Sequence, residues 1–288
     1  MAEPCVLVTG ASTGIGETTA CRLDRLGYLV FAGVRKPEDG TRLQTLASPR
    51  LVPLQLDVTK PTEIAAAVAA IAAIVGPRGL AGLVNNAGIA GGGPIEFVPV
   101  DAVRRIFEVN VFGLLAVTQA CLPLLRQARG RVVNVGSIAG RAVSPMVVPY
   151  GMSKHAVEAL TDGLRLELGT AGLLASVIEP GAVKTPIWDK GVEALGEAKR
   201  TLPAEALERY GAKLQVFGKV LGRLNERGVS TELVADAIVH ALESPRPKTR
   251  YLVGTDAKIR ALISRFLPNR LVDRLVLGAI RRMEADLS

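Results

Sequence analysis

The stretch Val8-Thr9-Gly10-Ala11-Ser12-Thr13-Gly14-Ile15-Gly16 decides the fold, because it links an apolar strand to a helix through a glycine-rich turn. The strand occupies residues 5–9, and a helical pattern continues through Leu26. Glycine adopts positive φ without strain and lets the backbone approach a ligand closely. The free amides and the dipole at a helix N-terminus favour a bound phosphate group. This order of strand, turn and helix predicts a dinucleotide pyrophosphate site, with a purely structural turn as the alternative.

Short apolar runs alternate with longer helical patterns along the rest of the chain. The expected strands begin at residues 5, 28, 51, 82, 131, 173 and 250. Most of them are apolar at both odd and even positions, which is typical of strands buried on both faces of a parallel sheet. The pattern predicts an α/β fold, a doubly wound parallel sheet of the Rossmann type, in a single domain over residues 1–288.

Two segments depart from this alternation. Residues 188–228 form a long insertion between the sixth and seventh expected strands, where we place substrate specificity. The tail, residues 255–288, carries apolar stripes at helical spacing, among them Ile259, Leu262 and Phe266, with basic residues on the opposite faces. Two interpretations of the tail stay open: helices that form a lid over the core, or interfacial helices that contact a membrane peripherally.

The positive charge of the chain is concentrated at its C-terminal end. The net charge is +8, and from Glu243 onward ten basic residues stand against five acidic ones. Such a basic segment is either a solvated face or a surface attracted to an anionic ligand or lipid. The basic residues are not interleaved with stacking aromatic residues, so no nucleic-acid partner is expected.

The composition excludes several classes of protein. The 288 residues are 49% hydrophobic and 4% aromatic, which is enough for one large core. Cys5, Cys21 and Cys121 stand alone, so neither a disulfide framework nor a metal site is predicted, and a reducing, cytoplasmic setting is expected. The N-terminus shows no export signal. The longest uncharged stretches, 64–76 and 109–125, are too short to span a bilayer.

Tyr150 and Lys154 lie four residues apart at the start of a helical pattern, so they share one face of that helix. A free tyrosine has a pKa of about 10, and an adjacent ammonium group lowers that pKa by stabilising the phenolate. The pair therefore indicates a phenol tuned for proton transfer, although the same spacing also occurs on surface helices. His155 points to another helix face and His240 lies in another helix, so no histidine-based nucleophilic triad is predicted.

The spacing Gly-x-x-x-Gly-x-Gly, together with Asn85-Asn86-Ala87-Gly88 after the fourth strand, resembles the short-chain dehydrogenase/reductase family. The resemblance extends over residues 6–185 and says least about residues 188–228. The segment from Tyr150 to Leu160, the long insertion and the tail resemble the steroid and retinol dehydrogenase branch, which implies bulky hydrophobic alcohols and ketones as substrates.

The resemblance implies a catalytic tetrad of Asn110, Ser137, Tyr150 and Lys154. Tyr150 would transfer the proton to or from the substrate oxygen, and Ser137 would hydrogen-bond the same oxygen. Lys154 would lower the Tyr150 pKa and hold the nicotinamide ribose, while Asn110 would position a water that links Lys154 to solvent. The alternative is a buried helix amide at Asn110 and a strand-end hydroxyl at Ser137.

The resemblance also implies the cofactor contacts. Asp57 would lie against the adenine, unless it only caps the following helix. The turn after the sixth strand would bind the nicotinamide carboxamide through the Val183 backbone and the Thr185 hydroxyl. The expected cofactor-binding residues are Gly10, Ser12, Thr13, Gly14, Ile15, Gly16, Arg35, Asp57, Val58, Asn86, Ala87, Gly88, Tyr150, Lys154, Val183 and Thr185.

The end of the second strand favours NADP(H) over NAD(H). An acidic residue there binds the ribose 2′-hydroxyl of NAD, whereas arginine accommodates the 2′-phosphate of NADP. The sequence at this point is Gly33-Val34-Arg35-Lys36, with two cations and no carboxylate. Thr13 departs from the pattern, because NADP-preferring relatives often carry a basic residue inside the glycine turn. NAD(H) remains the alternative.

The surroundings of Tyr150 predict a hydrophobic substrate. Residues 139–149 are mostly apolar, and we expect the insertion to add Ile187, Trp188, Leu214, Val216 and Phe217. A steroid-like or retinoid-like secondary alcohol or ketone, held at Ser137 and Tyr150, is the leading expectation.

Two other functions remain alternatives: a 3-oxoacyl thioester reductase, and a non-catalytic dinucleotide-sensing or scaffold protein. The family resemblance also implies a homodimer or homotetramer formed through the helices at 101–128 and 150–169. We expect a cytoplasmic protein, with the tail as the candidate site of peripheral membrane contact.

Overall fold

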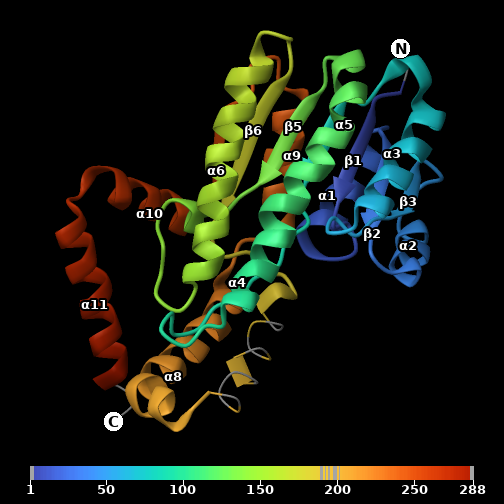
Figure 1. The fold of residues 1–288 in the computed structure, drawn as a ribbon. Helices are drawn as coiled ribbons and strands as arrows, with labels where there is room; N and C mark the ends of the chain where they lie inside the picture. Colours follow the sequence, from blue (N-terminus) through green and yellow to red (C-terminus); the bar gives the residue numbers. More distant parts are fainter. Residues whose placement is uncertain are drawn as a thin grey trace.

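A computed structural model describes residues 3–188, 191, 193, 195–196, 200 and 202–285 (Figure 1). Within these residues seven parallel strands form one sheet in the order β3-β2-β1-β4-β5-β6-β7. The strands are β1 Cys5–Thr9, β2 Leu29–Val34, β3 Leu51–Gln55, β4 Gly82–Asn85, β5 Arg131–Val135, β6 Leu174–Pro180 and β7 Arg250–Val253. The strands expected from the sequence are confirmed. Their order reverses between β1 and β4, where open α/β sheets bind ligands at the carboxyl ends of the strands.

Helices cover both faces of the sheet (Figure 1). Two helices pack together on one face, α1 Gly14–Arg25 and α9 Thr231–Glu243. The opposite face carries α3 Pro61–Val75, α5 Leu114–Ala128 and α6 Val148–Gly169. The remaining elements are α2 Pro37–Gln44, η1 Gly76–Arg78, α4 Val100–Phe107, η2 Glu108–Gly113, η3 Ile138–Gly140, α8 Ala204–Arg227, α10 Thr255–Phe266 and α11 Asn269–Ala285.

The first strand shows why the sheet is buried on both sides. Val6 and Val8 belong to the core shared with α1 and α9, whereas Cys5 and Leu7 belong to the core shared with α3 and α5. Successive side chains of a strand point to opposite faces. A run that is apolar at every position therefore needs helices on both faces, as the sequence predicts.

Two apolar stretches, Pro61–Arg78 and Val100–Ala128, would be long enough to cross a membrane by length and composition alone. Each presents buried residues to the sheet, for example Ile64 and Ile71 of α3 and Val117 of α5. Core helices that pack against a sheet can be equally long and equally apolar. That no segment spans a bilayer stays a prediction.

The insertion and the tail pack differently from each other. Leu214 and Leu221 of α8 are buried in a small cluster with Met146, from the loop before α6. In the tail, α10 packs through small residues such as Ala261, while its large apolar residues Ile259, Leu262 and Phe266 are 52%, 60% and 67% exposed. None of the described residues of α11 is buried, and this helix stands away from the sheet beside α8 (Figure 1). The large apolar side chains of α10 therefore do not form the expected lid over the core.

Candidate active site

The glycine turn has the geometry of a phosphate cradle. Gly10 and Gly14 have φ of +63° and +59°, the left-handed region that favours glycine. A Cβ on Gly10 would lie 2.8 Å from the Ala87 Cα, and one on Gly16 would collide with the Gly10 carbonyl. Thr13 is the N-cap of α1, but its side chain makes no capping hydrogen bond. The backbone can therefore approach a ligand at a helix N-terminus whose first amides lack a side-chain cap.

The turns after β1, β4 and β6 meet at this cradle. The Asn86 side-chain amide donates to the carbonyl oxygens of Thr9 and Gly10, at 3.1 and 3.0 Å. The Thr9 hydroxyl accepts the backbone N–H groups of Asn86 and Ala87, both at 3.0 Å. A Cβ on Gly14 would lie 3.1 Å from Thr185 Cγ2. These side chains hold the turns together, and the bare glycine backbone between them fits a dinucleotide.

Arg35 and Lys36 are exposed directly after β2, where the sequence predicts the adenosine end of the cofactor. The Asp57 Oδ1 accepts hydrogen bonds from the Thr59 N–H and hydroxyl, at 3.0 and 2.7 Å. Burial works against ionisation of Asp57, but the Thr59 hydrogen bonds and the charges of Lys60 and Arg35 leave its pKa below the ordinary value. Asp57 thus stabilises the turn before α3, and the adenine contact stays a prediction.

Arg42 is a residue that the sequence analysis missed. Its guanidinium, from α2, donates to the Ser12 carbonyl oxygen in the glycine turn and to the Glu17 carboxylate of α1. Arg42, paired with Glu17, therefore lies beside the glycine turn, which has Thr13 where NADP-preferring relatives often carry a basic residue. The signal in the sequence is a basic residue on α2, the helix that directly follows Arg35 and Lys36.

Ser137, Tyr150 and Lys154 come together at the carboxyl end of β5. Ser137 caps the short η3 turn, where its hydroxyl accepts the Ala139 N–H at 3.1 Å. Lys154 Nζ lies 5.7 Å from the centre of the Tyr150 ring and donates to the Val135 carbonyl at 2.8 Å. Both Tyr150 and Lys154 lie in α6, which packs against η3 and β6.

The electrostatics of this cluster follow from its burial. The expected lowering of the Tyr150 pKa is not found in the protein without a ligand: burial raises this pKa above its ordinary value, and the hydrogen bond with Ser137 opposes the rise in part. Burial lowers the Lys154 pKa to about 8, and the nearby Glu158 opposes that change. Without a bound ligand, Tyr150 is therefore an uncharged phenol near neutral pH. The pKa of Lys154 lies close to neutral pH.

Asn110 lies in the π-helical segment η2, which interrupts the path from α4 to α5. Its Oδ1 accepts the Ile89 N–H at 2.8 Å, and its Nδ2 donates to the Ile89 carbonyl and the Ser153 hydroxyl, both at 3.0 Å. A Cβ on Gly88 would lie 3.3 Å from Asn110 Oδ1 and 3.8 Å from Lys154 Nζ. Asn110 thus joins the loop after β4 to α6, while the water link to Lys154 stays a prediction. Short π-helical segments such as η2 often lie at functional sites.

The turn after β6 is fixed from two sides. The Ala182 N–H donates to Asp256 of α10 at 2.9 Å, and the Trp188 indole N–H donates to the Val183 carbonyl at 2.6 Å. The Thr185 hydroxyl is 3.5 Å from the same carbonyl oxygen. The expected nicotinamide turn therefore lies beside the glycine turn at Gly14 and Thr185, and Trp188 supports it. Of the expected substrate-lining residues, Leu214 is fully buried and Val216 is 5% exposed, so both pack inside the protein.

The comparison with known families identifies this architecture. The short chain dehydrogenase family model matches residues 4–195. The chain belongs to the short-chain dehydrogenase family. Members of this family are oxidoreductases, and the fold and motif resemblance inferred from the sequence are confirmed.

Curated relatives share nearly the full length of the chain. Retinol dehydrogenase 5 of Mus musculus is 37% identical, over 98% of this chain and 91% of the relative. The 17-beta-hydroxysteroid dehydrogenase type 6 of Bos taurus is 38% identical, over 94% of this chain and 87% of the relative. The NADPH-dependent 3-dehydrocapnine reductase of Ornithobacterium rhinotracheale is 34% identical, over 97% of this chain and 98% of the relative. The resemblance to the retinol and steroid dehydrogenase branch is confirmed.

Solved structures share the fold. A short-chain dehydrogenase from Streptomyces avermitilis superposes with a TM-score of 0.77 at 26% identity, covering 98% of each chain. A short chain dehydrogenase from Burkholderia cenocepacia, solved in complex with NADP, has a TM-score of 0.71 at 26% identity and covers 95% of this chain and 98% of its own. The fold therefore holds a nicotinamide dinucleotide in a related protein.

Proposed function

We propose that this protein is an NADP(H)-preferring oxidoreductase of hydrophobic secondary alcohols or ketones. The observation that carries the proposal is the convergence of Ser137, Tyr150 and Lys154 at the carboxyl end of the same sheet that carries the glycine cradle. The glycine cradle would hold the pyrophosphate of a dinucleotide, and the cluster would face its nicotinamide. The bound nicotinamide supplies or accepts the hydride.

In the proposed reaction, Tyr150 donates its phenolic proton to the substrate oxygen during reduction and takes it back during oxidation. The Ser137 hydroxyl donates a hydrogen bond to the same oxygen, where negative charge develops. The Lys154 ammonium stabilises the Tyr150 phenolate and holds the nicotinamide ribose. Asn110 ties the Ile89 backbone to the Ser153 hydroxyl beside Lys154 and would position the water through which protons return from solvent. Thr185 and Val183 would hold the carboxamide of the bound nicotinamide.

The apolar character of the substrate follows from the walls near Tyr150. The insertion, residues 188–228, packs Leu214 and Leu221 with Met146, and Trp188 and Phe217 lie partly buried at the edge of the same cluster. We propose that Trp188 and Phe217 form the apolar wall against which the substrate binds, with the buried leucines packed behind them, and that the insertion selects the substrate. The names of the relatives, a retinol and a hydroxysteroid dehydrogenase, point to the same class of molecule.

The preference for NADP(H) rests on Arg35 and Lys36, which are exposed beyond β2 where the 2′-phosphate would lie. Arg42 adds a further cation beside the glycine turn. A relative is named as NADPH-dependent, and a related structure was solved with NADP.

Fluorescence titration with NADPH and NADH tests this preference. We expect NADPH to bind at least about tenfold more tightly, which corresponds to about 1.4 kcal/mol, and Arg35→Asp to lose that margin. Arg25→Asp changes the net charge equally at the other end of α1, where the side chain is exposed, and should keep the margin. Equal binding of both cofactors by the wild type would show Arg35 to be a simple surface charge.

We further propose that the protein is a homodimer or homotetramer. An apolar hollow between α4, η2 and α6 is lined by Val100, Val103, Phe107, Phe112 and Met152. Phe112 is 53% exposed although it lies in the middle of this face. Exposed apolar patches of this kind mark interfaces. Sedimentation at micromolar concentration should show an oligomer that Phe112→Glu dissociates; a monomeric wild type would contradict the proposal.

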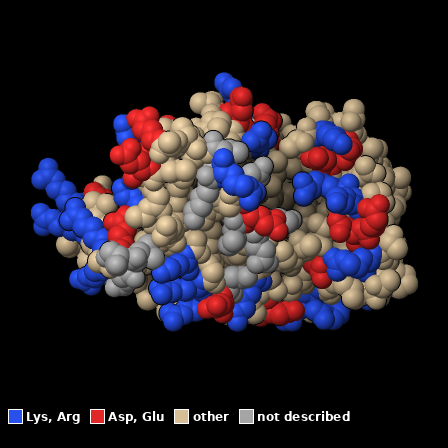
Figure 2. All heavy atoms as spheres, turned by 90° about the horizontal axis from the view of Figure 1, so that it is seen from below, with Lys and Arg blue, Asp and Glu red and all other residues tan. Residues whose placement is uncertain are grey.

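The tail is proposed to hold this cytoplasmic protein at an anionic membrane surface. On α11, Leu271 and Leu275 lie four residues apart on one helix face and are 42% and 52% exposed, and the helix also carries several arginines. Lys and Arg gather at the end of the molecule where α11 lies (Figure 2). Such helices bind with the apolar face in the headgroup region and the basic residues on anionic lipid. We expect co-sedimentation with phosphatidylserine-containing vesicles, lost in Leu275→Glu; equal recovery with and without vesicles would contradict this.

A further inference from the structure

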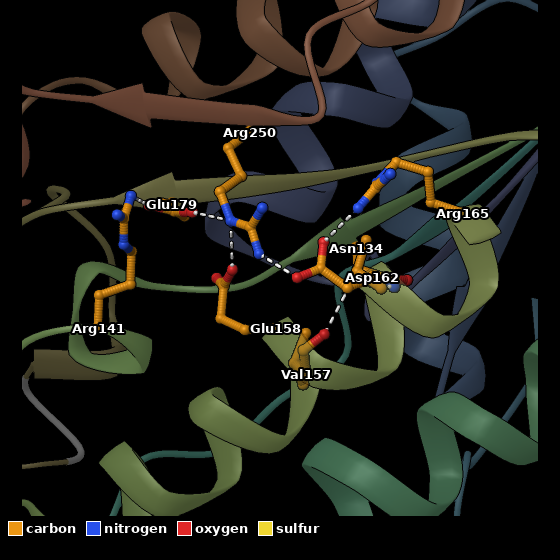
Figure 3. Close-up of polar contacts among 9 residues, drawn as sticks. Asn134, Arg141, Val157, Glu158, Asp162, Arg165, Glu179 and Arg250 are labelled. Atoms are coloured by element: carbon orange, nitrogen blue, oxygen red, sulfur yellow. Dashed lines mark hydrogen bonds and ion pairs between the residues drawn. The ribbon is translucent and has the colours of Figure 1, made fainter.

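A cluster of charged side chains, one of them fully buried, joins α6, β6 and β7 (Figure 3). At its centre the Arg250 Nε of β7 lies 3.0 Å from Glu158 Oε2 of α6 and 3.3 Å from Glu179 Oε1 of β6. Glu179 is fully buried, and the Glu158 side chain is 11% exposed. The charged groups that face Glu158 are Lys154 and Asp162 on α6, Glu179 on β6, Arg250 on β7 and Arg141 after η3.

The two glutamates are short of hydrogen-bond donors. Glu158 Oε1 and Glu179 Oε1 are both buried and accept no hydrogen bond from the described residues, although Arg250 Nε forms an ion pair with Glu179 Oε1 at 3.3 Å. The same Nε lies 3.0 Å from Glu158 Oε2, so one guanidinium group holds the two carboxyl groups next to each other. Two carboxylates cannot hydrogen-bond, because both are acceptors only, whereas an acid and a carboxylate can. One proton between them satisfies both oxygens and removes one of two adjacent buried negative charges.

The contacts show which glutamate holds the proton. Glu179 faces two guanidinium groups, with Arg141 Nη1 at 3.3 Å from its Oε2 and Arg250 Nε at 3.3 Å from its Oε1. Glu158 faces only one guanidinium group, that of Arg250, and the Nη2 of this arginine also pairs with Asp162 at 2.6 Å. The negative charge is therefore better stabilised on Glu179, and the proton belongs to Glu158. Burial and the neighbouring Glu179 raise the Glu158 pKa to about 7, although Arg250 opposes this change.

Glu158 stands one helical turn after Lys154, on the same buried face of α6. A Cβ on Gly140 would meet both the Lys154 carbonyl and the Glu158 Cγ, so the η3 turn packs tightly against this part of the helix. The charge on Glu158 therefore acts on Lys154 through protein rather than through solvent. A carboxylate at this position favours the protonated form of Lys154.

We propose that Glu158 and Glu179 share one proton, and that loss of this proton places a carboxylate near Lys154 that keeps Lys154 positively charged. Glu158 is thus a positioning residue: it does not touch the substrate, and it acts through the charge of Lys154. The shared proton rests on the two buried oxygens without hydrogen bonds and on the Arg250 Nε that contacts both carboxyl groups. Its effect on catalysis rests on the proposed function of Lys154 and Tyr150.

Infrared spectroscopy of the cofactor-free protein tests the shared proton. At about pH 6, below the Glu158 pKa of about 7, we expect a protonated-carboxyl band that disappears as the pH rises and is lost in Glu158→Gln. The control Glu167→Gln removes an exposed carboxylate from the same helix and should leave the band unchanged. A wild type without this band at about pH 6 would overturn the proposal, and that measurement needs no variant to fold.

Carbon NMR of ¹³C-lysine-labelled protein, also without cofactor, tests the link to Lys154. The Lys154 resonance should titrate about one pH unit lower in Glu158→Gln than in the wild type or Glu167→Gln, because one nearby charge shifts a pKa by roughly that amount. An unchanged titration would overturn the link.

In the reductive assay, the high-pH limb of kcat should move to lower pH in Glu158→Gln. A purely structural role would lower kcat at every pH without moving this limb. A moved lysine titration with an unmoved kcat limb would leave the acid pair intact and count against the role proposed for Lys154.

Discussion

Replacement of Tyr150 by phenylalanine is expected to lower kcat by about two to four orders of magnitude, the usual contribution of general acid–base catalysis. The phenol is the proton donor of the proposed reaction, and its ring is held in α6 beside Lys154, 5.7 Å from the Nζ. Removing one oxygen leaves that packing intact, while the glycine cradle and the turn after β6 are unaffected. Fluorescence titration should therefore show nearly unchanged dinucleotide binding alongside the lost turnover.

Tyr28→Phe is the matched control. The Tyr28 hydroxyl donates to Glu243 at 3.3 Å, away from the proposed tetrad, so its removal should leave kcat near the wild-type value. If Tyr150→Phe kept its turnover, the proposed proton donor would be wrong. If the cellular output of the protein survived the loss of turnover, the dinucleotide-sensing alternative would be favoured instead.

The strand pattern and the glycine turn were predictable because local chemistry determines them. The strand at 5–9 is apolar at every position and must be buried on both faces, and Gly10, Gly14 and Gly16 occupy positions that a Cβ would strain or block. Tyr150 and Lys154 were placed together by helical spacing alone. These features need no knowledge of the tertiary structure.

Other features depend on contacts between segments far apart in the sequence. Arg42 reaches the Ser12 carbonyl across 30 positions, and Glu158, Glu179 and Arg250 meet only because β6 and β7 are neighbours in the sheet. The sequence also leaves the exposure of Ile259 on α10 undecided, because an apolar stripe packs equally well against a protein core or against lipid. Periodicity identifies such a stripe but not its partner.

Lys154→Met is expected to separate catalysis from stability. Turnover should fall by a factor of about one hundred or more, since the Tyr150 phenolate loses its neighbouring cation. The fold should become more stable near pH 7, because burial lowers the Lys154 pKa from 10.5 to about 8. One pKa unit corresponds to about 1.4 kcal/mol, so the cost of the buried ammonium exceeds the roughly 1 kcal/mol of a single hydrogen bond such as that to Val135.

The pH dependence gives the sign of this effect. Because the folded-state pKa of Lys154 lies below its ordinary value, the unfolded chain binds more protons between about pH 8 and 10.5, and wild-type stability rises with pH across that window. The penalty is fully present below about pH 8. The melting temperature of Lys154→Met should therefore exceed that of the wild type near neutrality, and the difference should shrink as the pH approaches 10.5.

Lys248→Met is the control for this experiment. It removes the charge from an exposed lysine, so its stability should stay within about 0.5 kcal/mol of the wild type at every pH. A Lys154→Met protein that melts below the wild type near pH 7 would mean that the Val135 hydrogen bond outweighs burial of the charge. Greater stability with lost turnover would instead show that the fold keeps a costly buried cation because the reaction at Tyr150 requires it.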